Sequence, residues 1–156
     1  MRRYPQARLA EFRQILEPLT ITPGMRIGDV PAGGGYLQAH LPPGAIWEGH
    51  EPCASFTSHG AVSTTENHPL LPLPWPDHAL DAVVSLAGIH HLENKTGLFS
   101  EVGRVLKPAG IFVLSDVAEG TPVARFLDGF VGDHNSTGHE GSFLGERTLE
   151  ELHATG

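Results

Sequence analysis

Apolar residues near the start of the chain recur at helical spacing. They lie three or four positions apart, with arginines and glutamates between them, and are Leu9, Phe12, Leu16 and Leu19. This spacing places them on one face of a helix, so the segment is predicted to form an amphipathic helix. The proline and glycine of the 22–24 turn are expected to separate this helix from the next element.

Short apolar runs come after the turn and alternate with segments of helical pattern. Runs with the length and composition of buried strands cover 25–30, 45–51, 80–86 and 111–116, and a weaker strand candidate covers 61–65. Helical patterns lie between them, at 36–41 and 98–106. Strands that alternate with helices pair in parallel through right-handed crossovers. The sequence therefore predicts an α/β fold, an open, doubly wound, mostly parallel sheet with helices on both faces.

The last forty residues do not continue this alternation. Residues 117–156 are rich in glycine and histidine and contain one predicted helix, at 147–153, but no clear strand. We expect a single domain, made of an N-terminal helix and turn at 1–24, a ligand-binding core at 25–116 and a C-terminal region at 117–156. The C-terminal region is either a cap over the substrate side or the truncated end of a fold that lacks its last strands.

The composition of the 156 residues narrows the class of protein. Forty per cent hydrophobic and 18% charged residues allow a compact core. A net charge of −8 gives no general basis for binding nucleic acid, and the longest nearly apolar stretch, 82–89, is far too short to cross a membrane. The single cysteine, Cys53, forms no intrachain disulfide. We therefore expect a cytoplasmic protein without nucleic-acid or membrane partners.

Candidate chemistry gathers where the first two strands end. Asp29 ends the first strand, and Gly33 and Gly35 let the backbone approach a ligand at the start of the next helix. Glu51 lies twenty-two positions beyond Asp29, at the end of the second strand, where a carboxylate can accept hydrogen bonds from both ribose hydroxyls. In an open α/β sheet the carboxyl ends of the strands form the ligand site. The pattern therefore favours an adenosine-containing ligand over a mere tight turn.

Two common nucleotide motifs are missing from this region. A dinucleotide fingerprint requires a third glycine, but the sixth position counted from Gly33 is Gln38. A phosphate-binding loop of the Walker type requires Gly-Lys-Ser or Gly-Lys-Thr, and neither comes after the glycines. NAD is therefore disfavoured, and ATP bound through a Walker loop is excluded.

Several segments together carry a family resemblance. The stretch 29–37, an acidic residue with a glycine cluster after it, resembles the first motif of class I S-adenosylmethionine-dependent methyltransferases. The stretches 73–85, 90–92 (His-His-Leu) and 101–110 (Glu-Val-Gly-Arg-Val-Leu-Lys-Pro-Ala-Gly) are similar to the later motifs of the small-molecule branch called methyltransferase type 11. The resemblance runs from about residue 26 to residue 116 and implies the methyltransferase form of the Rossmann-like fold.

The resemblance implies S-adenosyl-L-methionine as the cofactor. It implies that Asp29 and the backbone at Gly33 and Gly35 hold the methionine part, and that Glu51 holds the ribose. One departure is that Pro31 stands where the motif has its first glycine. Proline has no N–H and a fixed φ, which this turn tolerates only if it needs neither a donor nor a positive φ there.

The resemblance also implies contacts for the two ends of the cofactor. Ser85, Leu86 and Ala87, where the 80–86 strand ends, would line the amino-acid end. Pro52 with Leu70 would border the adenine. The methyl acceptor would be a small molecule.

Few residues are needed for the reaction itself. Methyl transfer from a sulfonium is a direct displacement, so a general base is required only where the acceptor must lose a proton. Candidates at strand ends are His90, His91 and Asp116, and the alternative interpretation of the two histidines is structural hydrogen bonding at a turn. Acidic and histidine residues at 133–140 could form a mixed metal site, but their spacing is irregular, and we expect no metal.

Two alternatives to a self-sufficient enzyme remain. The chain could be a non-catalytic S-adenosylmethionine-binding module or a module that depends on a partner, because its final strands are not evident. If the 111–116 strand lies at the edge of the sheet, its free N–H and C=O groups favour a homodimer through that edge. A truncated version of a longer enzyme is the third interpretation.

Overall fold

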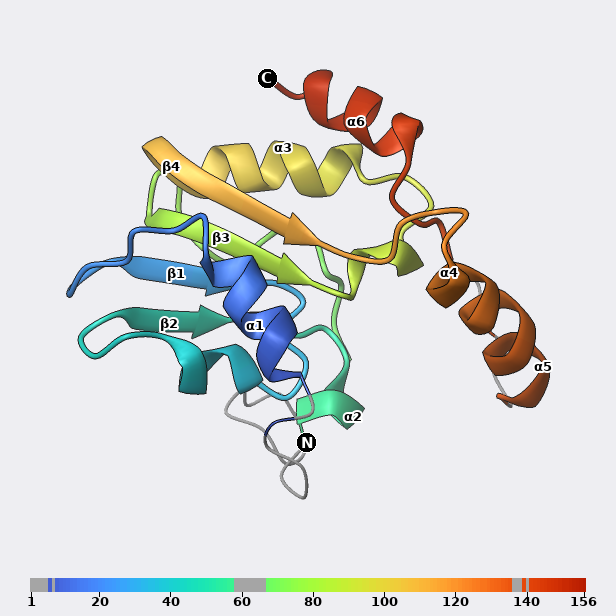
Figure 1. Ribbon diagram of the computed structural model, residues 1–156. Helices are drawn as coiled ribbons and strands as arrows, with labels where there is room; N and C mark the ends of the chain where they lie inside the picture. The colour runs from blue at the N-terminus through green and yellow to red at the C-terminus, as the bar shows by residue number, and fades with distance from the viewer. Residues whose placement is uncertain (1–5, 7, 58–66, 136–138, 140) are drawn as a thin grey trace.

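The computed structural model describes residues 6, 8–57, 67–135, 139 and 141–156, and its centre is a four-stranded parallel sheet (Figure 1). The strands, in the spatial order β2-β1-β3-β4, are β2 (Ile46–Gly49), β1 (Arg26–Asp29), β3 (Leu80–Leu86) and β4 (Leu106–Ser115). Every neighbouring pair in this order is parallel. This confirms the predicted open α/β sheet.

Helical segments connect and cover the strands. In chain order they are α1 (Leu9–Leu16), the 3-10 helix η1 (Tyr36–His40), α2 (Ala54–Thr57), the 3-10 helix η2 (Ile89–His91), α3 (Thr96–Val105), α4 (Pro122–Phe126), the π-helical turn η3 (Leu127–Val131), α5 (Gly132–His134) and α6 (Glu146–His153). Helices α1 and α3 lie on opposite faces of the sheet (Figure 1). Within the described part of the chain, no helix is both long and apolar enough to span a bilayer.

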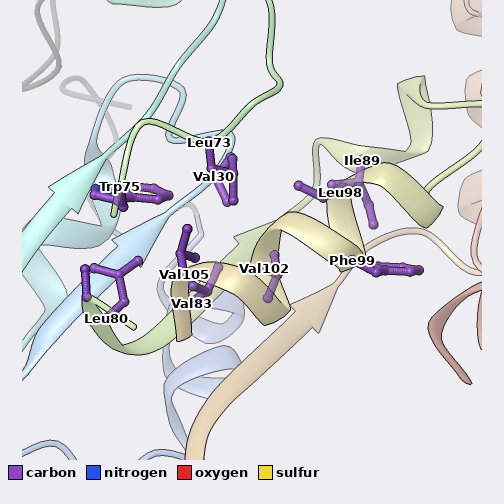
Figure 2. Packing of buried hydrophobic residues seen from close by; sticks show 11 residues of the cluster. Val30, Leu73, Trp75, Leu80, Val83, Ile89, Leu98, Phe99, Val102 and Val105 are labelled. Carbon is purple, nitrogen blue, oxygen red and sulfur yellow. The ribbon is translucent and has the colours of Figure 1, made fainter. Parts of the chain in front are cut away.

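Alternate residues of β3 divide the core into two layers. Val83 faces α3 and packs with its buried Leu98 and Val102, and Leu80, which lies before a register shift in the pairing with β4, belongs to the same cluster (Figure 2). Ala82 and Val84, two positions apart, face the other way, into the cluster that contains α1. Because side chains along a strand alternate between faces, this run of apolar residues fits a strand that is buried on both sides.

The packing of α1 results from its periodic apolar residues. Phe12 and Ile15 are buried against Ile27 of β1 and Leu37 of η1. Leu16 and Leu19 lie partly buried at the edge of the same cluster. The helix is therefore fixed on the sheet by its apolar face, and its first turn projects toward the carboxyl ends of the strands (Figure 1).

Arg104 of α3 fastens the proline-rich loop at 69–76 to the core. Its guanidinium donates hydrogen bonds to the carbonyl oxygens of Leu73 and Trp75 at 3.0 and 2.9 Å. It also pairs with the carboxylates of Glu101 and Asp77, at 2.7 and 2.9 Å. Hydrogen bonds from Arg104 hold the pKa of Glu101 below its ordinary value.

The weak strand candidate at 61–65 lies outside the described residues and stays a prediction. The structure differs from the expected elements in two other places. Strand β4 begins at Leu106 rather than at 111, and the pairing with β3 shifts register there, with Ala109 in the left-handed region at φ +65°. Residues 122–134 are helical, whereas the sequence predicted no helix there, because glycine and histidine obscure the periodicity of this segment.

Replacing Arg104 with alanine should lower the free energy of unfolding. The loss leaves two loop carbonyls and Glu101 without their shared charged donor, which costs roughly 1 to 3 kcal/mol. Urea denaturation compares this variant with Arg13→Ala, which removes an exposed arginine of α1 and should change stability little. Equal midpoints for the two variants would contradict the role given to Arg104.

Candidate active site

A cavity of about 470 Å³ opens at the carboxyl ends of β1, β2 and β3. Strand β1 lies between β2 and β3, so the connection after β1 leads to one side of it and the connection after β2 leads to the other. Ligands of open α/β sheets bind where the strand order reverses in this way. The segments that line it are 31–34, 36–37, 51–53, 86–88 and 91–92, together with the single residues Arg8, Phe12, Asp29, Phe56 and Leu70. The cavity therefore lies where the sequence predicted a ligand site.

Asp29 is a buried acid on the floor of this cavity. It ends β1, is 3% exposed, and its Oδ2 accepts a hydrogen bond from Nε1 of Trp47 at 3.1 Å. Burial, together with the nearby charge of Glu51, raises the pKa of Asp29 to about 7, although the Trp47 hydrogen bond opposes this. A cation in the cavity would favour the ionised form of Asp29.

Glu51 is the second buried acid, at 4% exposure, and it connects two segments of the cavity wall. Its Oε2 accepts the backbone N–H of Gly33 at 2.7 Å, and its Oε1 accepts the backbone N–H of Cys53 at 2.9 Å. A carboxylate oxygen can accept more than one hydrogen bond. Glu51 therefore fixes the glycine turn and keeps capacity for ligand hydroxyls.

The glycine turn has the backbone that its sequence suggested. Gly33 and Gly35 lie in the left-handed region, at φ +53° and +70°, which side chains other than glycine rarely adopt. A Cβ on Gly34 would collide with the ring of Tyr36. The turn therefore needs glycine at 33 and 35 for the backbone conformation, and at 34 for the space that the Tyr36 ring takes up.

Pro31 replaces the first glycine of the motif and lies in contact with another glycine, Gly88. Its ring packs against Gly88, where a Cβ would overlap the ring atoms. Both residues line the cavity. The departure from the motif is thus accommodated, because the residue facing Pro31 has no side chain.

The other predicted cofactor residues fall into two groups. Pro52, Leu70, Leu86 and Ala87 line the cavity together with Asp29, Gly33 and Glu51. Ser85 does not line it: this residue is fully buried, and its Oγ has no hydrogen-bond partner among the described residues. Gly35 also lies outside the lining and turns the chain into η1. The structure therefore brings together most of the predicted contacts, but not these two.

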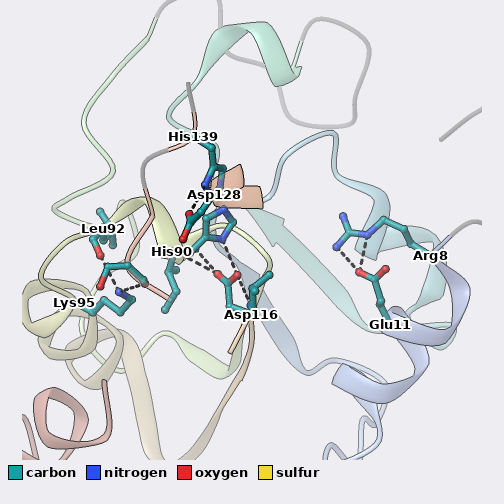
Figure 3. Close-up of polar contacts among 11 residues, drawn as sticks. Arg8, Glu11, His90, Leu92, Lys95, Asp116, Asp128 and His139 are labelled. Carbon is teal, nitrogen blue, oxygen red and sulfur yellow. Dashed lines mark hydrogen bonds and ion pairs between the residues drawn. The ribbon is translucent and has the colours of Figure 1, made fainter. Parts of the chain in front are cut away.

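His90 and Asp116 form a buried pair beside the cavity (Figure 3). Nδ1 of His90 lies 2.7 Å from Oδ1 of Asp116, whose carboxylate also accepts the backbone N–H groups of Ile89, His90 and Val117. Burial alone would raise the pKa of Asp116, but the hydrogen bonds from His90 and Val117 outweigh it, so the pKa lies below its ordinary value. This pair joins η2 to the end of β4.

His91 is the histidine candidate that reaches the cavity. It lines the wall, and its ring centre lies 4.2 Å from that of His90. His139 of the C-terminal region packs against both rings, at 5.5 and 5.7 Å. Within the described ranges, no group of three or more His, Cys, Asp or Glu residues has the arrangement of a metal site.

Lys95 connects the cavity wall to the C-terminal region. The residue is 1% exposed, and its ammonium donates to the carbonyl oxygens of Leu92 and Ser142, both at 2.8 Å (Figure 3). Its backbone N–H donates to Glu151 of α6 at 2.9 Å. Burial lowers the pKa of Lys95. Leu92 lines the cavity, so one side chain links this wall to the segment before α6.

Several cavity residues were not predicted from the sequence. Arg8 directly precedes α1 and Phe12 lies in it, whereas Tyr36 comes from η1, Cys53 from the segment after β2, and Phe56 from α2. The apolar spacing of α1 identified Phe12 as a core residue, but it carried no signal that this helix borders the ligand site.

Comparisons with known proteins agree with this geometry. A family model described as a methyltransferase domain matches residues 52–114. A sterol 24-C-methyltransferase of Gibberella zeae is 45% identical over 40 residues, which are 26% of this chain and 10% of that protein.

Two solved structures share the fold. An S-adenosylmethionine-dependent methyltransferase from Thermotoga maritima is 19% identical, with a TM-score of 0.69 over 95% of this chain and 70% of that one. The [4+2]-cyclase SpnF is 26% identical, with a TM-score of 0.72 over 97% of this chain. This chain covers 58% of the length of the cyclase and a smaller share of the sterol methyltransferase.

The chain shares its fold with S-adenosylmethionine-dependent methyltransferases, and its residues 52–114 match a methyltransferase domain. The cofactor of this class is S-adenosylmethionine, which carries an ammonium, a sulfonium and a carboxylate on an adenosine. The cavity fits such a ligand: its two buried acids complement the cations, and Glu51 has acceptor capacity for the ribose hydroxyls.

The raised pKa of Asp29 predicts a pH dependence of stability. Because the folded protein holds this proton up to about pH 7 whereas the unfolded chain releases it near pH 4, ionisation opposes folding as the pH rises between these values. The free energy of unfolding falls by an amount on the order of 4 kcal/mol over this range. Thermal or urea unfolding from pH 4 to 8 should show a smaller decline in the Asp29→Asn variant, which keeps an acceptor for Trp47. Parallel pH curves for the two proteins would refute the prediction.

Proposed function

We propose that this protein binds S-adenosylmethionine and transfers its methyl group to a small-molecule acceptor. The observation that carries the proposal is the meeting of Asp29, the glycine turn and Glu51 around one cavity at the carboxyl edge of the sheet. Each comes from a different segment, and the folding of the sheet is what brings them together. The family match and the shared fold support the same activity.

The proposed position of the cofactor matches the chemistry of the wall. The methionine part lies by Asp29 and the Gly33 backbone, the ribose by Glu51, and the adenine between Pro52 and Leu70. Leu86 and Ala87 close the amino-acid end, whereas Ser85 stays behind the wall. Ionised Asp29 then meets the cationic end of the ligand, so its proton is released on binding at neutral pH.

The chain contributes mainly by positioning the reactants. When bound, S-adenosylmethionine supplies an electrophilic methyl group on sulfur. The wall holds donor and acceptor in line, an effect that can lower the barrier by roughly 7 to 11 kcal/mol. His91 is the proposed base for an acceptor that must lose a proton, because it lines the cavity. His90 and Asp116 position it through the ring contact and the buried pair.

The remaining wall is suited to a small, partly apolar acceptor. The aromatic residues Phe12, Tyr36 and Phe56 line the cavity as well as the two acids. Aromatic side chains provide large apolar contacts with small molecules.

A cytoplasmic location is part of the proposal, because the lone Cys53 is free and the chain has no disulfide to require an oxidising compartment.

Cofactor binding tests the proposal directly. Calorimetric titration with S-adenosylhomocysteine should show binding that Glu51→Ala weakens by roughly 1.5 to 3 kcal/mol, since hydrogen bonds to a charged acceptor are lost. The matched control is Glu48→Ala, whose carboxylate on β2 pairs with Arg26 outside the cavity. No binding by the wild-type protein, or equal affinity of both variants, would reject the proposed site.

A second candidate function is a module that binds the cofactor without transferring methyl groups, or one that acts only with a partner. The free edge of β4 favours it, since one side of this strand has no neighbour among the described strands. One structure that shares the fold is a [4+2]-cyclase, so the fold by itself does not indicate methyl transfer. Incubation with methyl-labelled cofactor and a metabolite extract separates the two: a labelled product supports the enzyme, and binding without product supports the module.

We propose that the free edge of β4 pairs with a second copy of the chain. Ile111 on this strand is 43% exposed, and edge strands with apolar side chains and unpaired backbone groups associate readily. Sedimentation should show a dimer that Ile111→Lys dissociates. The control is Ile46→Lys on β2, the opposite edge, where the isoleucine is 47% exposed. A monomeric wild-type protein, or a dimer unaffected by Ile111→Lys, would contradict this pairing.

A further inference from the structure

One cation lies at the rim of the candidate cofactor cavity. Arg8 is the only lysine or arginine among the described residues that line it, whereas the buried acids Asp29 and Glu51 lie on its floor. The Arg8 side chain is 34% exposed, so it is accessible from both the cavity and the solvent. The cavity therefore has an acidic floor and a basic rim.

Helix α1 fixes the position of this guanidinium. Nε and Nη2 of Arg8 donate to Oε2 of Glu11 at 2.7 and 2.6 Å (Figure 3). The guanidinium carbon also lies 5.6 Å from the centre of the Phe12 ring. Because Phe12 is buried against the sheet, the helix holds Arg8 at one place on the rim.

The same packing identifies the end of the cavity that Arg8 faces. Phe12 belongs to the apolar cluster that contains Leu37 of η1 and the partly buried Leu86 of β3. Both leucines also line the cavity, at the end bounded by the glycine turn and the tip of β3. Arg8 lies one helical turn before Phe12 and therefore at this same end.

The chemistry of a guanidinium indicates what it binds there. Arginine has five N–H donors, and the contacts with Glu11 engage only Nε and Nη2. The remaining donors match a carboxylate, which arginine binds in a planar, two-point arrangement. A carboxylate that enters an otherwise acidic cavity needs such a partner, because an unpaired buried charge is costly.

We propose that Arg8 binds a carboxylate within the cavity, an inference that rests on the proposed function. The ligand that brings it is the amino-acid part of the cofactor or a carboxylate on the methyl acceptor. The location of Arg8 beside the glycine turn favours the cofactor. Helix α1, which lies outside the matched residues 52–114, is then part of the binding site.

Two ligand comparisons test the proposal. S-adenosylhomocysteine and its decarboxylated analogue, S-adenosyl-3-thiopropylamine, are each titrated into four proteins. These are the wild type, Arg8→Gln, Arg8→Lys and the exposed-arginine control Arg13→Gln. If the cofactor supplies the carboxylate, Arg8→Gln should weaken S-adenosylhomocysteine about tenfold and leave the analogue unchanged. Arg8→Lys should lie between wild type and Arg8→Gln, because it keeps the charge but not the two-point geometry.

The second comparison examines the acceptor. Benzoate and neutral benzamide are titrated into protein saturated with S-adenosylhomocysteine, and selective weakening of benzoate by Arg8→Gln assigns the carboxylate to the acceptor. The proposal is overturned if Arg8→Gln binds all four compounds as the wild type does. Failure of the wild-type protein to bind either nucleoside would instead reject the proposed function. Thermal unfolding of each variant confirms that it is folded.

Discussion

The candidate site depends on a carboxylate that is buried before any ligand binds. Glu51 accepts two backbone N–H groups, one from the glycine turn and one from the segment after β2, and so connects the ends of two strands. A carboxylate buried without hydrogen-bond partners would destabilise the fold, and these two hydrogen bonds offset that cost. They also leave the acid near Asp29, whose pKa is raised mainly by burial and further by the charge of Glu51. The buried carboxylate of Glu51 therefore both holds the glycine turn and adds negative charge to a cavity suited to a cationic ligand.

Much of the fold could be predicted because the strands are buried on both faces. The continuous apolar run of β3 and the positions of Asp29 and Glu51 at strand ends are local features of the sequence. The site could be predicted where binding requires a particular residue type, such as a carboxylate, at the end of a strand. Ser85 shows the limit: it adjoins Leu86, but alternation along the strand turns it behind the wall.

Other parts could not be predicted because they depend on tertiary contacts. The apolar spacing of α1 indicates a buried face, yet only packing against η1 and β3 brings Arg8 to the rim. The histidines are a similar case. Their positions after β3 suggested a catalytic role for both. Only the structure shows that His90 pairs with Asp116, which follows β4, whereas His91 lines the cavity. The helices at 122–134 lack strong periodicity and were missed for a local reason.

The buried ammonium of Lys95 gives the C-terminal region an influence on the cavity. It binds one carbonyl on the wall and another in the segment before α6, while its own backbone is held by Glu151. If α6 and the segment before it detach, the backbone N–H of Lys95 loses Glu151, the buried ammonium loses the carbonyl of Ser142, and the wall at Leu92 loses its link to the C-terminal region. Amide protons of α6 and of this wall would then exchange with solvent as one cooperative unit, although a long stretch of sequence separates them.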